Sequence, residues 1–149
     1  MNVRKQLLSG FTMIEILLSI AIVTLIAGMT APIYQRLQVT NSVKVTSQLI
    51  AEKLRRAQQL SMAAQNDSQW GVYIGTGNIV IYKGSTYATR DQSFDETTVI
   101  PTSNNVSGIT DLRFTKLTGL PSSTGFISVT QNTDSSTITI NSVGTITIQ

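Results

Sequence analysis

The sequence predicts an α+β fold in which one long N-terminal helix packs on a small antiparallel β-sheet domain. Two patterns predict it. Residues 11–65 combine a continuous apolar run with a later one-sided stripe, and both patterns are typical of helices. From Asn66 onward, apolar residues tend to alternate with serine and threonine, which is the pattern of strands that bury one face and solvate the other. We therefore expect a helical segment followed by a β-rich head over residues 66–149.

The chain begins with a short basic segment, residues 1–10, which carries Arg4 and Lys5 and ends in a small-residue pair. Residues 11–34 follow as a predicted transmembrane or filament-core helix. The uncharged run from Ile16 to Ile33 would span about 27 Å as a helix, close to the thickness of a bilayer core. Basic residues ahead of such a span predict a single-pass protein with a cytoplasmic N-terminus and an exported remainder.

Glu15 is the only charge in the apolar run from Phe11 to Tyr34. A carboxylate in a bilayer core costs about 2.5–3.5 kcal/mol on insertion scales, so a partner cation is expected. The run itself holds none. A cut between Gly10 and Phe11 would create an α-amino group one helical turn from Glu15. We therefore predict cleavage at this position, with Phe11 and Glu15 as the assembly residues.

An ordinary signal peptide is the competing interpretation of this segment. Such a peptide is cut after its apolar core, and Met29-Thr30-Ala31 would be an acceptable small-residue site. The run is long for a signal core, however, and an acid at its start is unusual. The alternative function is therefore a membrane-anchored or secreted β-rich protein for adhesion or binding.

The residues around the predicted cut carry a family resemblance. Ser9-Gly10-Phe11-Thr12-Met13-Ile14-Glu15, with Pro32 farther along, resembles the class III leader and N-terminal helix of type IV pilins and type II secretion pseudopilins. The resemblance implies cleavage after Gly10 by a prepilin peptidase and N-methylation of Phe11. It also implies that Glu15 pairs with the N-terminal amine of a neighbouring subunit during filament assembly.

The helical pattern continues past the apolar run, and residues 35–65 form a predicted amphipathic helix. One face carries the stripe Val39, Val43, Ile50, Leu54 and Ala57. Asn66-Asp67 predicts the end of this helix. Pro32 lacks an amide hydrogen and predicts a kink near Gly28. Many family members carry glycine at the position of Thr24, and we expect Gly28 to supply that flexibility here.

The head is predicted to start with a hairpin whose strands, Trp70–Ile74 and Ile79–Lys83, flank a glycine-bearing loop. Trp70 and Tyr73 are expected in the core. Further strands are predicted at Thr97–Ile100, Ile109–Thr115, Gly125–Thr130, Ser136–Asn141 and Thr145–Gln149.

A second, looser resemblance lies in the head. The glycines and apolar residues of Leu112–Phe114, Gly119, Gly125–Val129 and Ile138–Ile146, with Leu54–Gln58 on the helix, are similar to the minor pseudopilins related to general secretion protein H and to FimT-type minor pilins. Many members carry arginine after the last glycine, where this chain has Thr145. The branch therefore stays open between these two groups.

Composition argues against an enzyme. The chain has no histidine and no cysteine, which removes thiol nucleophiles, the usual imidazole base and the common zinc sites. The acids Asp91, Asp95 and Glu96 are expected close together in a solvated loop, and their spacing does not match that of a calcium loop. We therefore predict no metal and no cofactor.

A basic group on the second half of the helix makes DNA a second candidate partner. It consists of Lys44, Lys53, Arg55 and Arg56. A solvated helix face, or one that meets acids on a neighbouring subunit, is the favoured interpretation. The formal net charge is only +3 and includes Arg4 and Lys5 of the predicted leader, so the chain is not a strongly basic nucleic-acid binder.

The function predicted from the sequence is structural: a pilin or minor pseudopilin of a type IV pilus or a type II secretion pseudopilus. Its expected partners are prepilin peptidase, other pilin or pseudopilin subunits, an inner-membrane assembly platform and, before assembly, membrane lipid. Its expected location is the inner membrane and then a periplasmic or extracellular filament.

Overall fold

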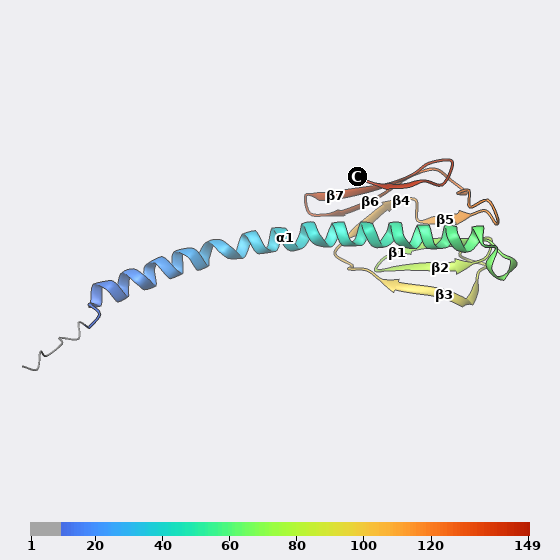
Figure 1. The fold of residues 1–149 in the computed structure, drawn as a ribbon. Coiled ribbons are helices and arrows are strands. Elements are labelled where there is room, and N and C mark those ends of the chain that lie inside the picture. The colour runs from blue at the N-terminus through green and yellow to red at the C-terminus, as the bar shows by residue number, and fades with distance from the viewer. Residues whose placement is uncertain (1–9) are drawn as a thin grey trace, which may run out of the picture. The chain divides into compact units, whose positions relative to one another are not determined.

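The computed structural model describes residues 10–149, without the side chains of residues 29–33. All of the predicted leader except Gly10 thus lies outside the described residues. The chain divides into two compact units, residues 1–37 and 38–149. Helix α1, Met13–Met62, belongs to both, and the strands belong to the second (Figure 1). The predicted fold class, a long helix with a small antiparallel β domain, is confirmed.

The first unit consists mainly of the N-terminal half of α1. Its backbone is helical through Gly28 and Pro32, and the side chain of Pro32 is not among those described. The kink predicted there stays a prediction. Within the described residues, no helical stretch is both long enough and apolar enough to cross a membrane.

The end of α1 lies at Met62, three residues before the predicted end at Gln65. Ala64 has a left-handed backbone, with φ at 47°, and a short 3-10 helix, Gln65–Asp67, follows. The buried side chain of Ser61 secures this end, because its Oγ accepts a hydrogen bond of 2.8 Å from the Trp70 amide and donates to the Trp70 carbonyl. The helix end and the first strand are therefore held together.

Two four-stranded antiparallel sheets make up the rest of the head, where the sequence analysis described one. Sheet A has the order β3 (Asp91–Val99), β2 (Asn78–Lys83), β1 (Trp70–Gly75) and β5 (Asp111–Phe114). Sheet B has the order β4 (Asn105–Gly108), β6 (Gly125–Gln131), β7 (Asp134–Ile140) and β8 (Ile146–Ile148). The predicted hairpin is confirmed as β1 and β2, joined by Thr76-Gly77.

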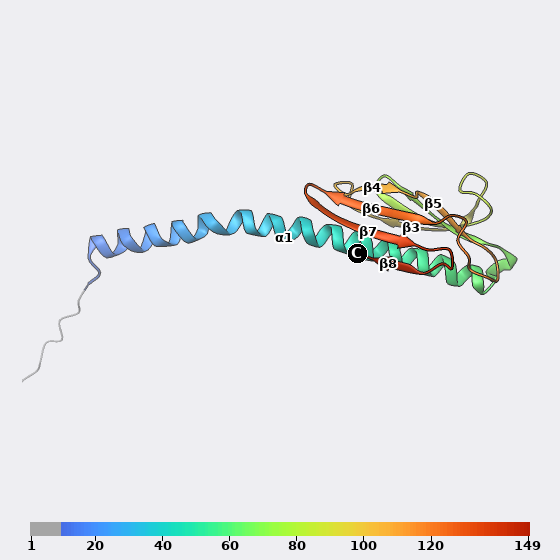
Figure 2. The same ribbon diagram turned by 90° about the horizontal axis from the view of Figure 1, so that it is seen from above.

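Both sheets pack on the C-terminal part of α1 around one core. The predicted helix stripe is confirmed from Val43 to Ala57: Ile50, Leu54 and Ala57 are fully buried, and Val43 nearly so, whereas Val39 is only half-buried. Strand residues from both sheets complete the core: Trp70, Val72, Ile74, Ile79, Ile81, Leu112, Phe114, Ile127, Val129, Ile138, Ile140 and Ile146. Figure 2 shows β7 and β8 running along α1. Arg55 donates to the carbonyl of Ile146 at 3.0 Å and so joins β8 to the helix.

Two predictions about sheet A are wrong. Asp91, Asp95 and Glu96 lie on β3 rather than in a loop, because that strand begins at Asp91 and not near Thr97. Tyr73 is only half-buried, whereas Trp70 is in the core as predicted. Successive strand residues point to opposite faces, so Tyr73 lies on the outer face of the sheet, where its ring stacks on Tyr87 with 3.8 Å between centroids.

Leu54→Ala is expected to lower the unfolding free energy of the head by about 2–5 kcal/mol, because it leaves a cavity beneath both sheets. Leu37→Ala is the control, since Leu37 lies on α1 with an exposed side chain. Urea denaturation followed by the fluorescence of Trp70, the single tryptophan, measures both. Equal losses for the two variants would contradict the described core.

Candidate functional site

The start of α1 is the candidate assembly site. Gly10, Phe11 and Thr12 precede the helix without regular structure, and all three are exposed. The Thr12 carbonyl accepts hydrogen bonds from the amides of Glu15, at 3.1 Å, and Ile16, at 3.2 Å. The Ile16 bond is the first regular bond of the helix, and the Glu15 bond satisfies one of the amide groups that a helix start leaves without partners. The link between Thr12 and Glu15 runs through the Glu15 amide, so it leaves the carboxylate available.

Glu15 lies exposed in the first turn of α1, where the helix dipole favours a negative charge. Within the described part of the chain, no basic side chain comes within salt-bridge distance of its carboxylate. Large apolar side chains precede or follow it along the chain, and each is at least half exposed: Phe11, Met13, Ile14, Ile16, Leu17, Leu18, Ile20, Ile22, Val23, Leu25 and Ile26. This segment therefore presents one charged side chain among mostly apolar ones.

The polar residues of this helical segment satisfy their own hydrogen-bonding groups. Ser19 Oγ donates to the Glu15 carbonyl at 2.7 Å, and Thr24 Oγ1 lies 2.9 Å from the carbonyls of both Ile20 and Ala21. Hydroxyls bonded in this way do not need a partner in apolar surroundings. Thr24, the departure from the family pattern, is therefore compatible with a helix packed in lipid or among other helices.

The predicted cleavage position is sterically open. An added Cβ on Gly10 would meet nothing within 4 Å, and the side chain of Phe11 is 79% exposed. Both residues that flank the predicted cut are thus exposed in the structure. The roles of Gly10, Phe11 and Glu15 in cleavage, methylation and assembly stay predictions.

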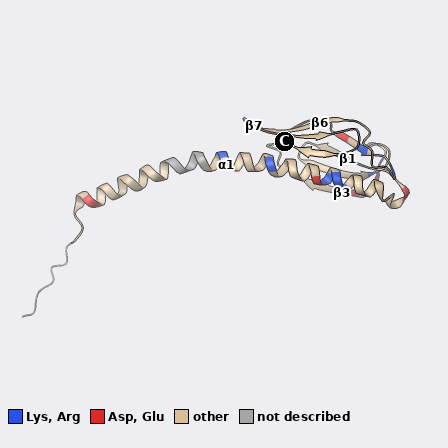
Figure 3. Cartoon of the chain, turned by 45° about the horizontal axis from the view of Figure 1, so that its top comes forward, with Lys and Arg blue, Asp and Glu red and all other residues tan. Residues whose placement is uncertain are grey.

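The basic group on α1 is partly engaged within the head. Figure 3 shows basic (blue) and acidic (red) positions along the ribbon in this part of the helix. Arg56 makes two hydrogen bonds to Glu96, at 2.8 and 2.7 Å, and Arg55 binds the Ile146 carbonyl. Two of the four predicted cations thus bind the chain itself, while Lys44 and Lys53 make no described salt bridge.

The acids of β3 also have partners. Glu96 pairs with Arg56, Asp95 with Arg90 at 2.8 Å and Asp91 with Lys83 at 3.9 Å. Hydrogen bonds from Ser93 lower the pKa of the Asp91 carboxyl. Among the described residues, no cluster of three or more acidic side chains is arranged to hold a metal ion. These acids therefore act in ion pairs along one strand.

Glu96→Gln is expected to weaken the pH dependence of head stability. The hydrogen bond from Arg56 lowers the pKa of the Glu96 carboxyl in the folded chain. A lowered carboxyl pKa adds stability above the unfolded value of about 4.3, and this stability disappears as the pH falls through the folded value. Both side chains are substantially exposed, so the contribution should stay below about 1 kcal/mol.

Urea denaturation at neutral pH and near pH 3 measures this effect. The stability difference between the wild-type chain and Glu96→Gln should be present at neutral pH and become smaller at about pH 3, below the unfolded value. A difference of equal size at both pH values would show that the pair does not act through its charge. Glu15→Gln is the control, because Glu15 is an exposed glutamate outside residues 38–149 and makes no described salt bridge.

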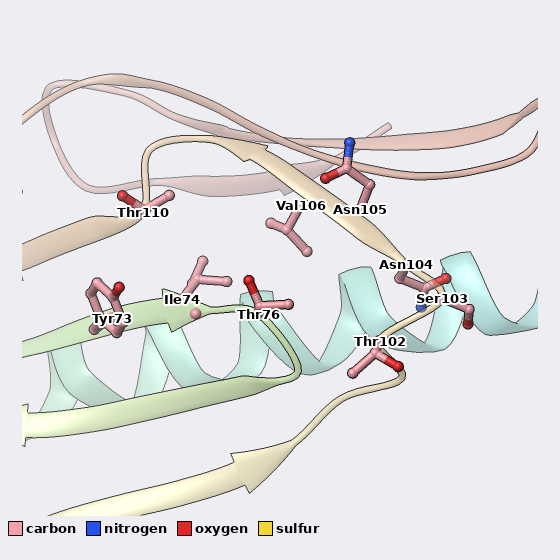
Figure 4. Close-up of a pocket in the computed structure, with 10 residues that line it drawn as sticks. Tyr73, Ile74, Thr76, Thr102, Ser103, Asn104, Asn105, Val106 and Thr110 are labelled. Atoms are coloured by element: carbon pink, nitrogen blue, oxygen red, sulfur yellow. The ribbon is translucent and has the colours of Figure 1, made fainter.

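The head also contains a pocket of about 340 Å³ between β1 and β4 (Figure 4). Its lining carries no acidic or basic side chain and consists of Tyr73, Ile74, Gly75, Thr76, Thr102, Ser103, Asn104, Asn105, Val106 and Thr110. The sequence analysis missed it together with β4. That strand is short and polar, and it follows Pro101 without a clear alternation.

Comparison with known proteins gives one informative match. No protein-family model matches the chain, and no curated protein sequence matches it. Among solved structures, this chain resembles the minor pseudopilin EpsH from the type 2 secretion system of Vibrio cholerae, with a TM-score of 0.54 and 11% sequence identity. The match covers 72% of this chain and 96% of that one. This chain therefore shares the fold of a minor pseudopilin.

Proposed function

We propose that this protein is a structural subunit of a type IV pilus or of a type II secretion pseudopilus. In this proposal a prepilin peptidase cuts after Gly10, Phe11 becomes the methylated N-terminus, and residues 11–34 serve first as a membrane anchor and then as a filament-core helix. Residues 35–65 connect this helix to the head over residues 66–149, and the protein acts without catalysis.

One observation carries the proposal: the Ser9–Glu15 sequence motif stands ahead of a head with the minor pseudopilin fold. The open backbone at Gly10 and the exposed carboxylate of Glu15 support it. The exposed apolar side chains of α1 support it as well, because a soluble monomer rarely leaves so large an apolar surface uncovered.

The proposed assembly step is charge neutralisation between subunits. Cleavage gives Phe11 a cationic amine, and docking beside a neighbour brings that amine to Glu15. At 4 Å and an effective dielectric near 20, the attraction is on the order of 4 kcal/mol before desolvation is subtracted. The pair therefore sets the register of the subunits, while packing of the apolar side chains of α1 supplies most of the contact. Pro32 and Gly28 would let the helix bend to fit.

The proposed partners follow from this step: prepilin peptidase, other pilin or pseudopilin subunits, an inner-membrane assembly platform, and lipid before assembly. Within the family, we propose the branch of the minor pseudopilin H and FimT-type minor pilins. DNA is a weaker candidate, because Arg55 and Arg56 already bind groups within the head.

Fractionation tests the proposal against a membrane-anchored adhesion or binding module. Cells are sheared, and the protein is quantified in the filament and membrane fractions. We expect the protein in filaments that contain other subunits, and filament-free cells should keep it in the inner membrane. A protein that stays in the membrane of filament-producing cells would favour the anchored module.

A further inference from the structure

Two edges of the sheets are covered by other parts of the chain. An edge strand presents unpaired backbone N–H and C=O groups, and proteins usually cover such an edge or place charges on it. On β8, the Ile146 carbonyl accepts the guanidinium of Arg55 from α1. Beside β5, the Arg113 carbonyl accepts the Ser122 amide at 2.8 Å. These edges are closed to a further strand.

The two remaining edges, β3 and β4, differ in charge. β3 carries Asp91, Asp95 and Glu96, which discourage pairing with another chain. β4 reads Asn-Val-Ser-Gly over Asn105–Gly108 and carries neither a charge nor a proline. β4 is therefore neither covered by another segment, as β8 and β5 are, nor charged, as β3 is.

The register shows which groups β4 offers. The Ile109 amide donates to the Phe126 carbonyl at 3.2 Å, in register with the β4–β6 ladder. Residues of an antiparallel pair alternate between facing the partner strand and facing away. The N–H and C=O groups of Val106 therefore point away from β6. None of the backbone hydrogen bonds between described segments ends on them.

The pocket lies on this open side of β4. In Figure 4, Val106 on β4 faces Thr76 and the end of β1 across the pocket, with α1 behind. Ile74 and Val106 provide apolar surface, and hydroxyl and amide groups from neighbouring residues surround it. A volume of about 340 Å³ lies within the range of ligand sites. The absence of charged lining favours an uncharged occupant.

The segment that leads into β4 is fixed in place. Asn104 is 6% exposed, and its Nδ2 donates to Thr46 Oγ1 at 2.6 Å and to Ser42 Oγ at 3.2 Å, both on α1. The backbone N–H of Asn104 also donates to the Pro101 carbonyl at 3.1 Å. An edge that is already ordered loses little conformational entropy when a ligand binds.

We propose that the β4 edge binds an extended, uncharged peptide segment of a partner protein, which adds to sheet B as a fifth strand beside β4. The backbone of the peptide would pair with Val106, and every second side chain would enter the pocket. An apolar side chain suits the surface of Ile74 and Val106, and a threonine or serine suits the rim. This site does not involve residues 11–34, so it stands apart from the proposed assembly function.

A labelled synthetic peptide, Thr-Leu-Ser-Leu-Thr-Asn, is the probe, because it is uncharged, alternates as the site requires and does not occur in this chain. We expect saturable binding to the full chain in fluorescence anisotropy and slower hydrogen exchange of the Val106 amide. A copy N-methylated on alternate residues, which cannot donate from one edge, should bind at least tenfold more weakly. The proposal would be overturned if both peptides bound equally well or if neither bound at millimolar concentration. It would also be overturned if the protein bound an uncharged oligosaccharide at this pocket but not the peptide.

Two matched substitutions locate the site. Val106→Pro removes an N–H that faces away from β6, and we expect roughly three- to tenfold weaker binding. Val99→Pro is the control, because the bond from the Ile100 amide to the Gly77 carbonyl shows that the Val99 N–H faces away from β2 on the β3 edge. Equal effects of the two changes would contradict the proposal.

A second variant covers the case in which Val106→Pro does not fold. Asn105→Lys adds a charge to an exposed position on β4 and should also weaken binding of the peptide. Unchanged binding to a folded Asn105→Lys protein would count against the edge. Cleavage and filament incorporation of this variant should stay normal, which separates failure of the peptide site from failure of the proposed function.

Discussion

Gly10→Val is expected to leave the protein as an uncut precursor that does not enter filaments. In the proposed function the peptidase cuts between Gly10 and Phe11. A branched side chain at residue 10 would obstruct binding of this segment in the active site of the peptidase. The substitution should not disturb this chain's own fold, because an added Cβ at Gly10 meets nothing within 4 Å. Immunoblotting for the size of the protein, with and without the peptidase gene, measures the result.

Gly28→Val is the matched control for this experiment. Gly28 is equally open to an added Cβ, and it lies within α1, far from the predicted cut. We expect normal processing of this variant, whatever its effect on filament packing. Efficient processing of Gly10→Val, or an equal defect in both variants, would show that the cut is elsewhere.

Glu15→Ala is expected to reduce incorporation into filaments by at least about a hundredfold while the protein is still cut and inserted. Removal of one member of a buried ion pair typically costs 3–5 kcal/mol, because the remaining charge is left without a partner. Here the remaining charge would be the Phe11 amine of a neighbouring subunit. Quantification of the protein in sheared filaments and in the inner membrane measures the change.

Glu52→Ala is the control, because Glu52 is also an exposed glutamate on α1 but belongs to the second unit, residues 38–149. It should incorporate at the wild-type level. Glu15→Gln sharpens the test, since it keeps the shape of the side chain and removes the charge. Normal incorporation of Glu15→Gln would contradict ion pairing as the basis of assembly.

The sequence predicted those parts of the fold that a simple period reveals. The stripe through Ile50, Leu54 and Ala57 marked the buried face of α1, and the alternation around Trp70 marked β1. Continuous periodicity over many residues gives a strong signal, because each buried position repeats the same geometric constraint. The division of the strands into two sheets left no such signal.

The missed elements share a physical cause. β3 reads as polar and acidic because Asp91, Asp95 and Glu96 are stabilised by basic partners far along the chain or beside the strand. β4 is short, and its position depends on the bonds of Asn104 to α1. Contacts of this kind are set by tertiary structure, so local pattern does not predict them. The pocket beside β4 was missed for the same reason.

The candidate assembly site was predicted from a different kind of evidence. A single acid in an apolar run is costly wherever the run is buried, so Glu15 points to a partner without any knowledge of the head. The structure places this residue in an exposed first turn beside Phe11. Its partner would belong to another subunit and would exist only after cleavage, so a single intact chain cannot contain the pair.

The N-terminal residue of the protein in purified filaments tests the central claim most directly. Mass spectrometry of the N-terminal peptide should give a chain that begins at Phe11 and carries one methyl group on its amine. Filament protein that keeps residues 1–10, or that begins near Pro32 after loss of the apolar helix, would contradict the account.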